Sequence, residues 1–121
     1  MASSVVTAAA AAGCVAVAAG AVVGAGAYAY HAGRLNSSLD APLDRSYDAA
    51  LAAVRDMEWT QVSTAKDTLD AKIVARTAED KEVTVRLERV TDEATDISIR
   101  IGGFGDERAS TALLARIRGH L

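Results

Sequence analysis

The sequence lacks charge over its first thirty-three residues, which contain no Asp, Glu, Lys or Arg. It also holds a single cysteine, Cys14, and a single proline, Pro42. One cysteine excludes an internal disulfide framework and any metal site built from several cysteines. His31 and His120 have no Cys or His near them at metal-ligand spacing. We therefore expect neither a metal site nor a cofactor.

A strong excess of either charge is also missing, because 13 Lys and Arg stand against 16 Asp and Glu, for a net charge of −3. Proteins that bind nucleic acid need a basic stripe, so we expect no nucleic-acid partner. No serine, threonine or cysteine stands in a pattern that sets a nucleophile beside a base and an orienting acid. We therefore expect a protein that is not an enzyme and has no catalytic residues.

The charge pattern divides the chain into an uncharged Ala/Gly/Val leader, residues 1–33, and residues 34–121, which suffice for one small domain. Residues 5–30 are long enough to span a bilayer, since about 20 residues do so. Their six valines favour insertion by only about 2 to 3.5 kcal/mol, and their glycines weaken a helix. A transmembrane helix is one interpretation of the leader, and an alanine-rich tail outside the membrane is another.

The third interpretation of the leader is a lipoprotein signal. The string Ala11-Ala12-Gly13-Cys14 is similar to a bacterial lipobox, in which small residues precede a cysteine that is acylated. Acyl chains such as palmitate would supply the membrane affinity that the valines lack, at about 0.8 kcal/mol per buried methylene. The pattern departs from the usual one in carrying Ala11 rather than Leu and no Lys or Arg in residues 1–4. Lipidation of Cys14 is our leading hypothesis.

Apolar periodicity along residues 34–121 predicts two helices and four to five strands. Residues 34–42 are polar and extended and predict a first strand. Pro42 and Asp44 suit the start of a helix over residues 43–57. Further strands are predicted over 59–65, 69–77, 82–90 and 95–102, and a second helix is predicted after a cap at Asp106.

The alternation of Ile97, Ile99 and Ile101 with polar residues is typical of an antiparallel strand with one buried and one wet face. The expected order is β-α-β-β-β-β-α. Both helices are expected to cover the apolar face of one sheet. The predicted fold class is therefore α+β, a two-layer sandwich of a four- to five-stranded antiparallel sheet with two helices on one face.

Three arginines, Arg76, Arg86 and Arg100, share the outer faces of neighbouring predicted strands, with Lys72 nearby. They are candidates to bind an anionic lipid head group or a partner's carboxylates. Acidic residues such as Glu88 interleave with them, so cross-strand ion pairs on a solvated face are the simpler explanation.

Trp59 and Phe104 are candidates for an apolar ligand pocket, although packing in the core is the simpler role for Trp59. The glycine-rich loop 102–105 lies between a predicted strand and helix, where phosphate loops occur. It lacks the glycine spacing and the lysine of phosphate-binding motifs. A tight turn that leads into a cap at Asp106 is the expected structure.

Several stretches are similar to a known family: Gly13-Cys14 with the Ala/Gly/Val tract that follows, residues 39–44 leading into Tyr47, and residues 97–107. The chain resembles, from about residue 13 to its end, a bacterial family of small lipoproteins catalogued as a domain of unknown function. The resemblance implies export and a lipid on Cys14, and it implies no known activity. Val15 after the cysteine favours sorting to the outer membrane, facing the periplasm.

The leading hypothesis is a non-enzymatic lipoprotein of the bacterial cell envelope. Cys14 anchors it to the membrane, and residues 34–121 form a structural or interaction module for an envelope protein that the sequence does not identify. The alternative is a protein that binds a lipid-like or small apolar ligand in a pocket between the helices and the sheet. A large apolar pocket near Trp59 and Phe104 would distinguish the alternative from the leading hypothesis.

Overall fold

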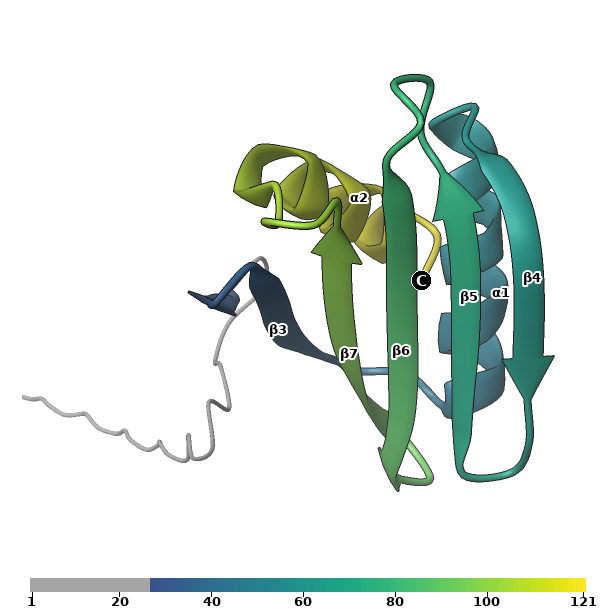
Figure 1. Cartoon of the computed structure of the whole chain (residues 1–121). Helices are drawn as coiled ribbons and strands as arrows, with labels where there is room; N and C mark the ends of the chain where they lie inside the picture. The colour runs from purple at the N-terminus through teal and green to yellow at the C-terminus, as the bar shows by residue number, and fades with distance from the viewer. Residues whose placement is uncertain (1–26) are drawn as a thin grey trace, which may run out of the picture.

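The computed structural model describes residues 27–121 of the chain. These residues form six strands and two helices (Figure 1). In chain order the elements are β2 (Ala29–His31), β3 (Arg34–Leu39), α1 (Leu43–Asp56), β4 (Thr60–Lys66), β5 (Asp70–Arg76), β6 (Glu82–Thr91), β7 (Ala94–Ile101) and α2 (Glu107–Gly119). The predicted order β-α-β-β-β-β-α is confirmed from β3 onward.

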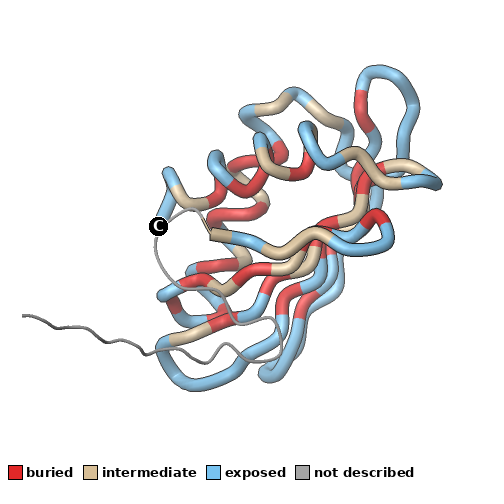
Figure 2. Tube along the Cα trace, turned by 90° about the vertical axis from the view of Figure 1, so that its left-hand side faces the viewer, coloured by how far each residue is buried: buried red, intermediate tan, exposed pale blue. Residues whose placement is uncertain are grey.

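All six strands belong to one antiparallel sheet, in the spatial order β2-β3-β7-β6-β5-β4. Strands β4 to β7 form a meander in which each pairs with the next, and β3 extends the sheet by pairing with β7. Helix α1 carries the chain from β3 to β4 at the far edge. Both helices lie on one face of the sheet, so the molecule has two layers (Figures 1 and 2). The two-layer α+β architecture is confirmed.

The sheet has one strand more than the upper limit of the four to five that we predict. The additional strand, β2, pairs with β3 across a two-residue turn, Ala32-Gly33. Both turn residues have a positive φ, 53° and 83°, which is typical of type I′ hairpin turns. The strand escapes sequence prediction because it lies in the uncharged leader and contains no alternating aliphatic residues. The sheet thus includes residues 29–31, which we assigned to the uncharged leader.

Helix α1 follows the sequence prediction closely, since its observed bounds differ from the predicted 43–57 by one residue. Pro42 precedes it with φ −61° and ψ 160°, an extended conformation that lets the chain enter the helix without a lost hydrogen bond. Ala50 and Val54 face the sheet with 0% and 2% exposure. Glu58 ends the helical segment with a φ of 61°, which turns the chain toward β4.

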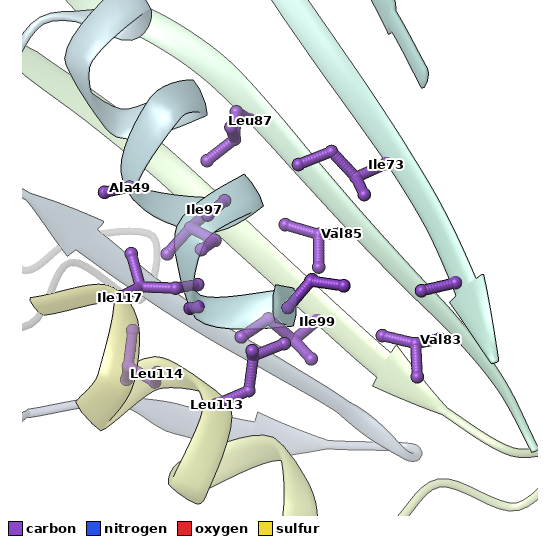
Figure 3. Packing of buried hydrophobic residues seen from close by; sticks show 14 of the residues in the cluster. Ala49, Ile73, Val83, Val85, Leu87, Ile97, Ile99, Leu113, Leu114 and Ile117 are labelled. Atoms are coloured by element: carbon purple, nitrogen blue, oxygen red, sulfur yellow. The ribbon is translucent and has the colours of Figure 1, made fainter. Parts of the chain in front are cut away.

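The core lies between the sheet and the two helices (Figure 3). Alternate residues of the central strands, among them Val85 and Ile99, are fully buried, and Leu113 and Ile117 of α2 meet them. Each such side chain contributes about 1.5–3 kcal/mol when it is removed from water. The Asp106 side chain accepts a hydrogen bond from the Ala109 N–H at 3.0 Å, so the predicted cap of α2 is confirmed.

Candidate functional site

The face of the sheet that the helices leave uncovered, here called the open face, carries rows of like charge. Residues directly opposite each other on paired strands form these rows. Arg34 of β3 lies opposite Arg100 of β7, and Arg86 of β6 lies opposite Lys72 of β5. A neighbouring row is acidic across three strands and consists of Asp96, Glu88 and Asp70.

Like charges directly opposite each other destabilise a sheet unless something neutralises them. Among residues 27–121, neither Arg86 nor Lys72 takes part in a salt bridge of 4.0 Å or less. The same holds for Glu88 within that part of the chain. The cross-strand ion pairs that we expected on this face are therefore not formed at contact distance, and the central cations remain available to a partner.

The three predicted arginines share the open face but differ in their contacts. Arg76 donates to the backbone carbonyl of Asp80 at 3.2 Å and forms a salt bridge with its carboxylate at 3.4 Å. Arg100 donates to the carbonyls of Ala32 and Gly103 at 2.9 and 2.6 Å. Within the described residues Arg86 makes no such side-chain contact. The structure thus separates two arginines that hold turns in place from one, Arg86, that has no structural bond there.

The Arg100 guanidinium joins two loops that are far apart in the sequence. One is the β2–β3 turn and the other is the glycine loop 102–105. Gly105 has a φ of +87°, and a Cβ built on it would lie 2.4 Å from the Cα of Gly33. Only glycine allows two backbone segments to approach so closely. The glycine loop is therefore the tight strand-to-helix turn that we predict.

The structure does not bring Trp59 and Phe104 together in a pocket. Trp59 is half-buried against the core just before β4, at the far edge of the sheet. Phe104 follows β7 and is 100% exposed. Strands β5 and β6 separate β4 from β7. Phe104 therefore does not line a space between the helices and the sheet.

The surface of the described residues has a hollow of about 500 Å³ between the start of α1 and the β4–β5 turn. Its charged groups already pair with one another, Lys66 with Asp44 at 2.7 Å and Arg89 with Asp92. The hydrogen bond with Asp44 raises the pKa of Lys66. A second hollow, of about 360 Å³, lies around Lys81 and Gly102. Neither hollow has the mostly apolar lining that ligand pockets have.

Among residues 27–121, no three His, Cys, Asp or Glu side chains lie together as a group that could hold a metal ion. His120 instead forms a hydrogen bond of 2.6 Å with Asp56. That bond lowers the pKa of Asp56. It ties the C-terminal end of α2 to α1.

Cys14 lies outside the described residues. The chain that leads from it enters the fold at Ala27, whose carbonyl accepts hydrogen bonds from Ser37 Oγ at 2.6 Å and from Arg118 at 3.3 Å. Burial lowers the pKa of Arg118. Its Nη2 lies within hydrogen-bond distance of three oxygens, at 2.6 to 3.3 Å. Between residues 27 and 121 no helix combines the length and apolar character needed to cross a membrane.

Sequence reasoning missed Arg34 as a member of the cationic rows and Tyr28 and Tyr30 as parts of the fold. The sequence alone does not place Arg34 opposite Arg100, because the register between β3 and β7 depends on the tertiary fold. Tyr28 and Tyr30 are the signal in the leader that could have indicated a strand, since Tyr is common in strands.

The sequence profile of a family described as Protein of unknown function (DUF3568) matches residues 1–120. No curated protein matches the sequence.

Proposed function

The chain belongs to the family described as Protein of unknown function (DUF3568), and we propose that it is a non-enzymatic lipoprotein of the bacterial cell envelope. In this proposal Cys14 carries the lipid that holds the protein on the membrane, most simply the outer membrane on its periplasmic side. The α+β domain acts as an interaction module for another envelope protein. The uncharged leader supports the membrane part of the proposal, since it contains no charge that would oppose contact with lipid.

The open face of the sheet carries the proposal of an interaction module. It places Arg86 opposite Lys72 and Arg34 opposite Arg100. A sheet that keeps like charges in such positions gives up stability. A partner that brings carboxylates to these rows removes the repulsion and gains charge-assisted hydrogen bonds. Because Arg100 already has a structural role, the Arg86–Lys72 row is the centre of the proposed binding surface.

The proposed partner presents a cluster of carboxylates that faces two adjacent rows of the sheet. The acidic row of Asp70, Glu88 and Asp96 borders the Arg86–Lys72 row and repels a partner that docks out of register. Charge of this kind mainly steers association and sets specificity. Because exposed charges are screened within about 8 Å at physiological salt, binding should weaken as salt is added.

The packing of the described residues favours this function over binding of an apolar ligand. Ile73, Ile99 and Leu113 are 0% exposed between the sheet and the helices. Phe104, a candidate to line such a pocket, is fully exposed instead. A lipid-like ligand needs an apolar cavity, and the two hollows described above are lined largely by charged residues.

Reversal of the central charges tests the proposal. In the double variant Arg86→Glu/Lys72→Glu the row changes sign without loss of a structural bond seen among residues 27–121. Arg45→Glu/Arg55→Glu is the matched control, because both arginines are exposed on α1 and the net charge changes equally. The tagged chains are cross-linked in envelopes, and the captured proteins are identified by mass spectrometry.

We expect the wild type and the α1 control to capture the same envelope protein, and the open-face variant to lose it. The captured protein should carry clustered carboxylates, and its capture should fall with salt. If the open-face variant captures the same proteins as the control, the open face is not the binding surface and the proposal fails.

A further inference from the structure

Aromatic side chains gather at the edge of the sheet where the leader enters the fold. The protein has five aromatic residues: one Trp, three Tyr and one Phe. Tyr28 and Tyr30 lie in or beside β2, and Phe104 lies in the adjoining glycine loop. The hydroxyl of Tyr30 is 2.6 Å from the position that a Cβ on Gly105 would take. Tyr30 packs against the core, whereas Tyr28 and Phe104 are exposed. These three residues are here called the aromatic edge.

Backbone packing and hydrogen bonds of the glycine loop hold Phe104 in its exposed position. Its carbonyl oxygen is 2.8 Å from the position of a Cβ on Gly33, so the loop packs directly on the β2–β3 turn. Arg100 fixes both segments by donating to Ala32 on one side and Gly103 on the other. The ring itself remains 100% exposed. The loop therefore presents an apolar ring to the surroundings without a partner among the described residues to cover it.

We propose that the aromatic edge is the surface with which the domain contacts the lipid bilayer, and that the ring of Phe104 enters the membrane interface. The inference rests on the membrane attachment proposed above and adds the orientation of the domain. Aromatic rings with a polar tip favour the level of the lipid head groups, and the exposed Tyr28 provides one such ring. The exposed ring of Phe104 gains from burial in that layer.

Two further features favour lipid over a protein as the occupant. The chain runs from β2 directly into the charge-free leader, so this edge is where the proposed anchor joins the domain. The thirteen steps from Cys14 to Ala27 span at most about 45 Å even when fully extended. The domain cannot travel far from the bilayer on such a connection.

The charges around the aromatic edge also suit a lipid surface. Arg34 follows the β2–β3 turn, and Arg108 lies in the first turn of α2; both are exposed and can reach lipid phosphates. Two carboxylates follow the glycine loop, and of these only Asp106 pairs with a cation among the described residues. Asp106 caps α2 and pairs with Lys81 at 3.4 Å, and Glu107 accepts the Tyr28 hydroxyl at 2.8 Å.

The test places a single tryptophan at the proposed contact. Phe104→Trp is made in a Trp59→Phe background, and the full chain is reconstituted with vesicles of phosphatidylethanolamine and phosphatidylglycerol. Some vesicles carry bromine atoms on the acyl chains, which quench a tryptophan that lies among them. The control is Val90→Trp in the same background, since Val90 is exposed at the opposite end of the sheet.

We expect the tryptophan at position 104 to shift its emission to shorter wavelength and to be quenched by the brominated lipid. The tryptophan at position 90 should show neither change. Equal quenching at the two positions, or none at position 104 while the chain floats with the vesicles, overturns the inference and leaves the proposed anchor standing. A chain that does not float at all contradicts the anchor itself, and with it the inference.

Hydrogen exchange of the unsubstituted full chain provides a second measurement, which does not depend on folding of the variants. Vesicles should slow exchange in residues 102–105 and leave the β6–β7 turn at residues 92–93 unchanged. If slowing instead requires a soluble envelope extract and is not seen with vesicles alone, the aromatic edge binds a protein and the inference is wrong.

Discussion

Replacing Gly105 with Ala tests the packing of the glycine loop on the β2–β3 turn. The φ of Gly105 is +87°, a region that costs a residue with a side chain about 1–2 kcal/mol. The added Cβ would lie 2.4 Å from the Cα of Gly33 and 2.6 Å from its carbonyl oxygen. Both are backbone atoms and cannot rotate away, so the loop and the turn must move apart.

Gly102 isolates the cost of the backbone conformation from the cost of the clash. Its φ is +77°, but the nearest atom to an added Cβ is the Cδ of Lys81 at 3.6 Å, an ordinary contact. Gly102→Ala should therefore destabilise by only about 1–2 kcal/mol. Gly105→Ala also strains the hydrogen bond from Arg100 to Ala32, which is worth about 0.5–1.5 kcal/mol. These two contributions total about 1.5–3.5 kcal/mol, to which the clash itself adds.

Urea unfolding followed by circular dichroism measures these differences, with Gly103→Ala as the control because nothing lies within 4 Å of its added Cβ. That control should change stability by no more than about 0.5 kcal/mol. In thermal melts, 1 kcal/mol corresponds to about 4–8 °C for a domain of this size. If Gly105→Ala unfolds at the same urea concentration as Gly102→Ala, the close approach of loop and turn is not real.

Three further predictions concern the core, the α2 cap and the start of the fold. Ile99→Asp should cost several kcal/mol, because it buries a carboxylate without a partner, whereas Ser98→Asp on the open face should stay within about 0.5 kcal/mol; equal melting temperatures contradict the strand assignment. Replacing Asp106 with Ala should cost about 1 kcal/mol. The hydrogen bond from the Ala109 N–H lowers the pKa of Asp106. The stabilisation by this cap is therefore complete above pH about 4 and is lost as the pH falls through the lowered pKa. A difference in urea midpoint that persists unchanged in acid would contradict this prediction. The fragment 27–121 should resist urea better than 34–121, which lacks β2, and equal midpoints would show that β2 adds no stability.

Local sequence patterns predict most of the elements because each leaves a periodic signal in adjacent residues. The alternation through Ile97 to Ile101 places β7 within one residue of its observed bounds. The helical spacing after Pro42 does the same for α1. β2 escapes prediction because three residues with small and aromatic side chains give no period to detect. Its existence depends on pairing with β3 and on the positive φ of Ala32 and Gly33.

The candidate surfaces are predictable only in part, because they depend on strand register and on contacts between distant residues. The shared face of Arg76, Arg86 and Arg100 follows from alternation along each strand. Which of them is occupied does not, since Arg100 bonds to a carbonyl 68 residues away. Likewise, the exposure of Phe104 depends on the contact of Gly105 with Gly33, which no local pattern encodes.

Attachment through Cys14 is tested most directly by the intact mass of the protein extracted from bacterial membranes. We expect the mass of residues 14–121 with acyl chains on Cys14. The Cys14→Ser variant should keep its leader and carry no lipid. A protein that retains Met1 and an unmodified Cys14 while it resides in the membrane fraction would contradict the lipoprotein proposal.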